Sequence, residues 1–318
     1  MLNYILKRTA MMVLILFIII SIAFCVLRLM PGGPYDDDFE LTPEAIAALE
    51  ARLNLDKPMP VQYFLFIKGV LLENDWGTSI KLRPGVPVFE IIVERIPASM
   101  VLNIASLLIA IPMGVLAGSL AAVFKNKVPD YVISFLVVIC ISVPSFVFAS
   151  LLQYFLAGQA KVLPLIYDAS GNTIAQIKSL ILPVMALSFN PIATVTRYLR
   201  GELIETLSSE YMLLARTKGL KKPKAVMRHA FRNSMVPLAN IIIPMFTNVL
   251  GGSMVVEAIF AVPGIGGILV DSITVSDYSL AIGALLFYSF ISVATILLVD
   301  ISYGIIDPRI RLGAKNNG

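Results

Sequence analysis

Six stretches of this sequence are apolar over the length that a helix needs to cross a lipid bilayer. About 20 residues of helix span the roughly 30 Å of hydrocarbon in a membrane. The stretches are residues 9–30, 98–124, 131–157, 179–199, 237–260 and 279–304. Hydrophobic residues make up 58% of the chain and charged residues 14%, a more apolar mixture than soluble domains have. The sequence therefore predicts an all-α, polytopic membrane protein with six transmembrane helices.

The first stretch follows two basic residues, Lys7 and Arg8, as the apolar region of a secretory signal also does. Its apolar core is longer than that of a signal, and no small-residue cleavage site follows it. We therefore predict a retained helix that also directs insertion into the membrane.

Lysine and arginine are concentrated on one side of the predicted helices. If six helices alternate in direction, both termini and the connections near 125–130 and 205–236 lie on the same side. The basic residues of these segments are Lys7, Arg8, Lys125, Lys127, Arg216, Lys218, Lys221, Lys222, Lys224, Arg228, Arg232, Arg309, Arg311 and Lys315. Basic residues favour cytoplasmic loops, so both termini are predicted to be cytoplasmic. This bias explains the net charge of +4 without a nucleic-acid partner.

The segment at 31–97 is too long for a simple turn and lies on the opposite side in this topology. After an acidic cluster at 36–38, Thr42 as N-cap and Pro43 as first residue predict one helix. The sequence PVQYFLFIKGVLLEN predicts a second, amphipathic helix, and DWGTS a turn. We predict a small extracytoplasmic helical subdomain that caps the helix ends or docks a soluble partner. The predicted parts are the N-terminus with the first span (1–30), this subdomain (31–97) and a five-helix core (98–318).

Polar side chains within the predicted spans are costly in lipid, so we expect them to face other helices or a watery path. They are Asn103, Gln153, Asn190, Asn240, Asn248, Glu257 and Asp300. Interhelical hydrogen bonding and a lining role are both open to them. Prolines at 112, 144, 183, 191 and 244 are predicted to interrupt the middle four spans, as in helices that line transport paths. Cys25 and Cys140 lack metal-ligand spacing, which predicts buried thiols.

Signatures of an enzyme are absent from the sequence. It contains no G-x-x-x-x-G-K-[ST], H-E-x-x-H or G-x-S-x-G motif. The single histidine, His229, lies in the basic connection beside Arg228. We therefore expect no catalytic, cofactor-binding or metal site in this chain.

The basic connection LLARTKGLKKPKAVMRHAFRNSMVP, residues 213–237, begins with the pattern of a short helix that stops abruptly. Ser208 or Ser209 is predicted to cap this helix. Gly219 is predicted to end it in the left-handed conformation, with the apolar Leu220 following.

A second helix is predicted directly after this turn. Pro223 suits its first position, and Val226, Ala230 and Phe231 recur at a spacing that places them on one face. The bias of charge toward one side of a membrane explains the lysines and arginines here, but not this pair of punctuated helices.

The connection resembles the cytoplasmic EAA loop of ABC-importer permeases, in the form found in the oligopeptide/dipeptide permease family. In that form ARxKG is followed by RHAxRN and a later proline. The matching residues are Ala215, Arg216, Lys218, Gly219, Arg228, His229, Ala230, Arg232, Asn233 and Pro237. Leu213 and Leu214 replace the first two letters of the EAA signature, and the connection is longer than in sugar-type permeases. Both departures are ordinary for peptide-type members.

Similarity to the first-type permease of this family extends over essentially the whole chain. The similar stretches are LRLMPGGP at 27–34, LDKPMPVQY at 55–63, VERIPASMVLNIAS at 93–106, SVPSFVFASLL at 142–152, VVEAIFAVPGIGGILVDSITVSDY at 255–278 and DPRIRLG at 307–313. The resemblance implies the type I ABC-importer permease architecture and a place in the cytoplasmic membrane of a prokaryote.

The resemblance also implies partners. They are a homologous second permease, two ABC ATPase subunits and an extracytoplasmic substrate-binding protein. ATP and Mg²⁺ are then used by the ATPases and not by this chain. The residues implied for coupling to an ATPase are Glu210, Ala215, Arg216, Lys218, Gly219, Leu220, Lys221, Lys222, Pro223, Arg228, His229 and Arg232.

A candidate translocation path follows from the polar residues together with the segment AVPGIGG, 261–267, which is predicted to be a non-helical outer segment near the mouth. Its residues are Asn103, Gln153, Asn190, Asn248, Pro263 and Gly264. The implied function is alternating-access import of oligopeptides or dipeptides. Nickel and glutathione are alternative substrates within the family. A secondary transporter or a membrane scaffold protein is a more distant alternative.

Overall fold

The chain consists of helices joined by short connections. A computed structural model describes residues 2–29, 42–52, 54–220, 224, 226–247, 249 and 253–306. Within these residues the β-structure is limited to an isolated antiparallel bridge between Thr78 and Pro87. The all-α prediction is thereby confirmed. The residues fall into two compact units, Met1–Ala98 with Pro263–Ile301 and Ser99–Val262 with Ser302–Gly318. The three-part division drawn from the sequence stays a prediction.

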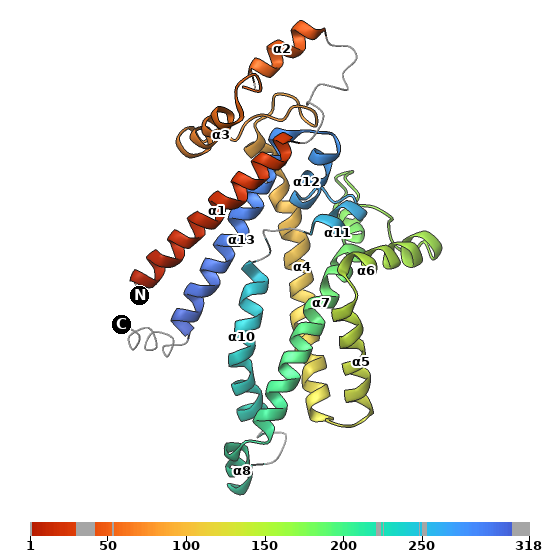
Figure 1. Cartoon of the computed structure of the whole chain (residues 1–318). Helices are drawn as coiled ribbons and strands as arrows, with labels where there is room; N and C mark the ends of the chain where they lie inside the picture. Colours follow the sequence, from red (N-terminus) through yellow and green to blue (C-terminus); the bar gives the residue numbers. More distant parts are fainter. Residues whose placement is uncertain are drawn as a thin grey trace. The chain divides into compact units, whose positions relative to one another are not determined.

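Unit 1 contains the first and last long helices, which run side by side (Figure 1). Its elements are α1 (Leu2–Leu29), α2 (Pro43–Arg52), α3 (Met59–Lys68), η1 (Gly69–Glu73), the start of α4 (Val88–Val123), α12 (Ile265–Thr274) and most of α13 (Tyr278–Ile306). Phe24 of α1 packs against Tyr63 and Phe66 of α3, with ring centroids 5.3 and 5.5 Å apart. These aromatic contacts join α3 to the end of the first span.

The short helices of unit 1 agree with the sequence. Helix α2 begins at Pro43, as predicted, and the predicted amphipathic helix at 60–74 is present as α3 continued by the π-helical turn η1. The DWGTS turn is confirmed, because Oδ1 of Asp75 accepts a hydrogen bond from the Gly77 amide and Gly77 has a φ of 83°. Residues 30–41, with the acidic cluster, lie outside the described residues.

Unit 2 is built around α7, the most extensively buried of its long helices. Its elements are the rest of α4, α5 (Val128–Ser142), α6 (Ser145–Leu152), η2 (Gln153–Gln159), α7 (Thr173–Leu207), α8 (Glu210–Thr217), η3 (Val226–Phe231), α10 (Arg232–Thr247) and α11 (Met254–Ile259). Asn172 caps α7 by accepting hydrogen bonds from the amides of Ile174 and Ala175. The helices α5, α6 and α10 pack against α7.

Close contact between α4 and α7 depends on two glycines one turn apart, Gly114 and Gly118. A Cβ atom on Gly114 would lie 2.7 Å from Cβ of Val195, and one on Gly118 would lie 2.9 Å from the carbonyl oxygen of Thr196. Thr196 also donates its hydroxyl to the carbonyl of Gly114 at 3.2 Å. Small residues four apart allow helices in membranes to approach closely. The sequence GVLAG carried this signal, which our sequence analysis did not use.

The predicted number of six spans is confirmed only in part. Four helices among the described residues are long and apolar enough to cross a membrane, within α1, α4, α7 and α13. A fifth candidate is the pair α5 and Ser145–Gln159, bent by 101°. The predicted span at 237–260 is not one long helix in the described residues, since α10 ends at Thr247 and the separate α11 begins at Met254.

Two predictions from the sequence were wrong in detail. Among the named prolines only Pro144 coincides with a break, whereas those at 112, 183, 191 and 244 lie inside continuous helices. Neighbouring helices and side chains can satisfy the backbone groups that a proline frees within a membrane. Cys25 is exposed and Cys140 is half-buried, because α1 and α5 lie at the surface of this chain.

Candidate coupling segment and polar sites

The segment between α7 and α10 contains the helix predicted from the basic stretch. We refer to residues 208–231 as the α8 segment. Helix α8 spans Glu210–Thr217, and Gly219 follows with a φ of 87°. The short helix and its left-handed stop are thereby confirmed. This backbone region is strained for residues that carry a Cβ atom, which explains the glycine.

The predicted hydroxyl cap of α8 is not formed. The hydroxyl of Ser208 donates to the carbonyls of Ile204 and Glu205, and that of Ser209 donates to the carbonyl of Thr206. Both serines thus satisfy the last carbonyls of α7, which lack partners within the helix. The backbone amides of Met212 and Leu213 in α8 donate to the backbone carbonyl of Ser209.

The inner side of the α8 segment is apolar and packs against unit 2. Met212 is 3% exposed and belongs to a buried cluster with residues of α7 and α10. The predicted shared face is confirmed, because Ala230 is buried in this cluster and Val226 and Phe231 pack against it. The cluster consists of Ala122, Val195, Leu199, Leu203, Met212, Ala230 and Leu238.

The outer side of the α8 segment combines charge with exposed leucines. Glu210, Lys218 and Arg232 are exposed, and their assignment to coupling stays a prediction. Leu213 and Leu214 are 65% and 54% exposed. Adjacent apolar side chains that stay exposed on a short helix indicate a contact surface. In the sequence these leucines stand out only as departures from a motif, and no local pattern marks them as surface residues.

Other residues predicted for coupling are placed only in part. Leu220 is half-buried against the apolar cluster. The backbones of Ala215 and Arg216 lie in α8, and those of Arg228 and His229 lie in η3. Lys221, Lys222 and Pro223 fall outside the described residues, as does the predicted start of the second helix.

An ion pair that the sequence analysis missed ties α5 to α7 near the α8 segment. Arg200 donates to Asp130 through two nitrogens, with Nε 2.6 Å from Oδ1 and an Nη atom 2.8 Å from Oδ2. Asp130 is 1% exposed and also accepts a hydrogen bond from the Asn126 amide. A two-point arginine–carboxylate contact fixes orientation as well as distance. Arg200 follows Leu199 of the apolar cluster, so this pair holds the base on which the segment packs.

The polar residues assigned to a translocation path occupy different environments. The amide of Asn103 donates to the carbonyl of Ser99 in its own helix. Gln153 donates to the carbonyls of Leu165 and Ile259, both at 2.9 Å. Asn190 is exposed on α7, and Asn248 lies outside the described residues. Their assignment to a path stays a prediction.

The segment AVPGIGG is shorter as a non-helical element than predicted. Ala261, with a φ of 51°, through Gly264 are non-helical, but α12 begins at Ile265. Pro263 is half-buried and Gly264 is buried. Gly266 and Gly267 lie in the first turn of α12.

Glu257 is fully buried in unit 2 and has hydrogen-bond partners. Its Oε1 accepts from the hydroxyl of Ser99 at 2.8 Å and from the amide of Ser253 at 3.1 Å. The expectation of interhelical bonding therefore holds for this residue. In the loop before α7, hydrogen bonds from Ser170 hold the pKa of the Asp168 carboxyl below its usual range.

A second buried carboxylate, Asp277, organises unit 1 and was missed by the sequence analysis. It precedes α13 and receives hydrogen bonds from five donors in two parts of the chain. The donors are the hydroxyl of Ser79 and the amides of Ile80, Lys81, Leu82 and Leu280. We refer to residues 77–87 as the Asp277-bound turn. An aspartate just before a predicted helix suggests a cap, but sequence gives no reason to expect partners almost 200 positions away.

Potential metal ligands do not cluster in the described part of the chain. There, no group of three histidine, cysteine, aspartate or glutamate side chains lies close enough together to hold a metal ion. Asp130, Glu257 and Asp277 are each surrounded by hydrogen-bond donors of the chain itself.

Comparison with known proteins gives consistent matches along the chain. Residues 110–312 match the family model described as binding-protein-dependent transport system inner membrane component. Residues 1–103 match the model for the N-terminal part of such membrane components. The dipeptide transport system permease protein DppB of Lactococcus lactis is 40% identical over 312 residues, covering 98% of this chain and all of the relative.

Two further relatives are similar over the same length. The dipeptide permease protein DppB of Bacillus subtilis is 33% identical over 99% of this chain. The oligopeptide transport system permease protein OppB of Escherichia coli K12 is 35% identical over 98% of this chain. Each relative is covered completely.

Proposed function

Because the chain belongs to the family of inner-membrane components of binding-protein-dependent transport systems, we propose that it is a permease subunit of an ATP-driven peptide importer. Three relatives whose names specify dipeptide or oligopeptide transport align over nearly the whole chain. Peptides are therefore the substrate class that this similarity favours over nickel or glutathione.

The proposed topology has six spans with both termini in the cytoplasm of a prokaryote. In this arrangement the bent pair of α5 and α6 with η2 forms the third span, and α10 with the residues that follow forms the fifth. The concentration of lysine and arginine at the termini and at the α8 segment supports this orientation. The α8 segment then lies in the cytoplasm, and the Asp277-bound turn lies outside.

The α8 segment is the observation on which the proposed mechanism rests. Its inner face is held to α7 and α10 by apolar packing, while Leu213, Leu214 and Lys218 are exposed. A groove on a soluble ATPase would accept this apolar and basic surface. Closure of two ATPases on ATP would displace the segment, and the buried cluster would carry the displacement into α7.

The proposed assembly contains this chain, a homologous permease, two ATPases and an extracytoplasmic binding protein that delivers peptide. This chain contributes one half of the path and a docking surface, whereas ATP and Mg²⁺ bind to the ATPase subunits. Substrate movement then follows from alternating access and requires no chemical step on this chain.

Purification of the tagged chain in mild detergent, with identification of co-purifying proteins by mass spectrometry, tests this proposal. We expect a second permease of the same family and ATPases that contain Walker motifs. Reconstituted with its binding protein, the complex should import a labelled peptide only when ATP is present. Isolation of the chain alone, with solute movement that needs no ATP, would contradict the proposal in favour of a secondary transporter.

A further inference from the structure

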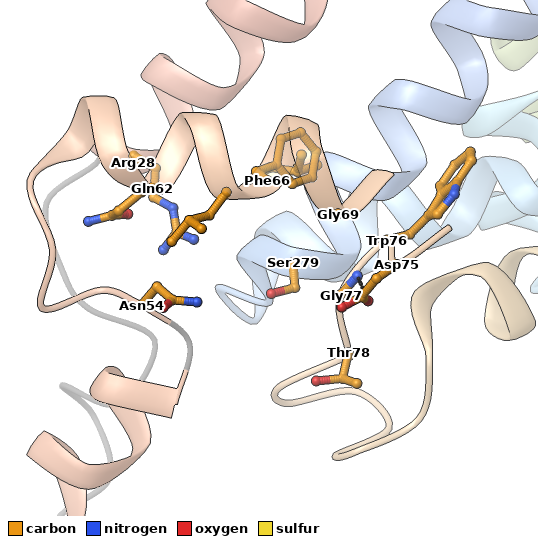
Figure 2. Close-up of a pocket in the computed structure, with 12 residues that line it drawn as sticks. Arg28, Asn54, Gln62, Phe66, Gly69, Asp75, Trp76, Gly77, Thr78 and Ser279 are labelled. Atoms are coloured by element: carbon orange, nitrogen blue, oxygen red, sulfur yellow. Dashed lines mark hydrogen bonds between the residues drawn. The ribbon is translucent and has the colours of Figure 1, made fainter. Parts of the chain in front are cut away.

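A cavity of about 280 Å³ lies in unit 1, where α1, α3 and α13 meet. Figure 2 shows Arg28 and Gln62 at one end of this cavity, Asp75 and Trp76 at the other, and Ser279 between them. We refer to it as the Arg28 cavity. It combines a cation, a carboxylate and an aromatic ring within one partly open space.

In the proposed topology, the Arg28 cavity lies at the level where the lipid hydrocarbon ends. Arg28 is the penultimate residue of the span Leu6–Leu29, and Ser279 lies in the first turn of the span that begins at Tyr278. Arginine at a helix end and tryptophan are the residues that membrane proteins place at the headgroup region. The polar end of a lipid is therefore present at this depth.

Two polar atoms at the Arg28 end of the cavity lack hydrogen-bond partners. The guanidinium of Arg28 lies 5.5 Å from the ring of Phe24, but its Nε is buried without a hydrogen-bond partner in the described part of the chain. The amide oxygen of Gln62 is likewise buried and has no hydrogen-bond partner in the described part of the chain. Buried polar atoms are normally bonded. An anion with oxygen acceptors would complement the charge of the Arg28 guanidinium, which lines the cavity.

Asp75 favours a cationic donor over a neutral one. It is exposed in the cavity and uses one oxygen to accept a hydrogen bond from the Gly77 amide at 2.8 Å. A ligand with an anionic group near Arg28 and an ammonium group near Asp75 matches both charges. The chemistry is that of a phosphate linked to a primary amine.

An apolar groove continues from the cavity toward the middle of the spans. Trp76 lines both spaces, and the groove is otherwise lined by aliphatic and aromatic side chains, among them Phe17, Ile20 and Leu286. Along α13 the cavity residues Ser279 and Ile282 are followed by groove residues one turn deeper. The groove has a volume of about 450 Å³. A polar site at the headgroup level and an apolar groove below it match the two parts of one amphipathic molecule.

We propose that unit 1 binds a glycerophospholipid with a phosphate and a primary ammonium in its headgroup. The phosphate lies at Arg28, the ammonium lies between Gln62 and Asp75, and an acyl chain lies in the groove beneath Trp76. The bound lipid would join α1 to α3 and α13 at the membrane surface. This inference does not depend on the transported substrate.

Native mass spectrometry of the purified full chain tests the lipid site. Delipidated protein is incubated with phosphatidylethanolamine or phosphatidylcholine of identical acyl chains, which differ only in the methyl groups on nitrogen. We expect phosphatidylethanolamine to be retained on the order of tenfold better, because the quaternary ammonium of phosphatidylcholine offers no N–H donor. Equal retention of the two lipids would overturn the proposal.

Two substitutions assign the charges. Arg28→Gln should lower phosphatidylethanolamine retention on the order of tenfold, since charge-assisted hydrogen bonds are lost. Asp75→Asn should reduce the preference over phosphatidylcholine while phosphate binding persists. Arg83→Gln is the matched control, because Arg83 pairs with Glu94 and does not line the cavity. Equal retention by the Arg28 and Arg83 variants would exclude the site, and preserved thermal unfolding identifies variants that remain folded.

Discussion

The α8 segment and the Asp277-bound turn both connect helices outside the long spans, but they are held in place by different forces. The α8 segment is held by apolar side chains against α7 and α10. The Asp277-bound turn is held by one buried carboxylate with five hydrogen-bond donors. Hydrogen bonds fix a particular geometry, whereas apolar burial has no preferred direction. The position of the first segment thus depends on the fit of apolar side chains, and that of the second on a set of directed hydrogen bonds.

The largest expected effect is the loss of the carboxylate at position 277. Asp277→Ala should destabilise unit 1 by on the order of 5 kcal/mol, because several charge-assisted bonds, each contributing about 1.5–3 kcal/mol, disappear together. Thermal unfolding in detergent and protease sensitivity of residues 77–87 would measure this. Asp271→Ala is the control, since Asp271 is an exposed acid of the same unit. Equal unfolding temperatures and equal protease sensitivity of the two variants would show that the Asp277 carboxylate does not hold the turn.

Neighbouring positions on α8 allow a sharper test of apolar anchoring. Met212→Ala should cost about 2–3 kcal/mol, at the low end of buried Met→Ala changes because the site lies near the surface. Leu213→Ala should change stability by less than about 0.5 kcal/mol, as exposed substitutions usually do. Hydrogen exchange of the α8 amides in both variants would separate them. The anchoring model fails if both lose the same protection.

Two glycine substitutions test the α4–α7 contact, and we expect them to change stability in opposite directions. Gly114→Ala should destabilise the protein by about 1–3 kcal/mol, because the new methyl group meets Val195 and the carbonyl of Ile192. Gly201→Ala should stabilise it by about 0.5–1 kcal/mol, since this α7 glycine has open space around it. Thermal unfolding of the two variants provides the comparison. Destabilisation by both would show that helix packing does not decide the outcome.

The most local expected effect concerns the turn after α8. Gly219→Ala should cost roughly 1–2 kcal/mol, because a φ of 87° disfavours a Cβ atom although no side chain blocks the space. Membrane insertion should be unchanged, and the global unfolding temperature should fall by only about a few degrees. The exchange rates of the α8 amides should rise, and unchanged rates would indicate that the turn is not needed to position the helix.

Sequence patterns predicted correctly those structural features that depend on residues close together in the chain. The apolar runs predicted α1, α4, α7 and α13, and the glycine at 219 predicted the end of α8. The shared face of Val226, Ala230 and Phe231 followed from helical spacing. Each of these features depends on residues within a few turns of one another.

Long-range partners could not be read from the sequence. Asp130 and Arg200 are 70 positions apart, and Asp277 bonds to a turn almost 200 positions earlier. Pro144 and Pro183 carry the same local signal, yet a bend occurs at the first and a continuous helix at the second. Packing against other helices decides such cases, and a single sequence does not show it.

The most direct test of the central claim measures ATP hydrolysis and peptide uptake together in proteoliposomes that contain the complete importer. The variant replaces Leu213 and Leu214 by aspartate, which leaves the buried cluster intact but removes the apolar docking surface. Our account predicts a normally folded chain with at least about a tenfold loss of both uptake and substrate-stimulated hydrolysis, since two apolar anchors at an interface contribute well over 1.4 kcal/mol. Wild-type uptake and hydrolysis in this variant would contradict the claim that the α8 segment couples the chain to an ATPase.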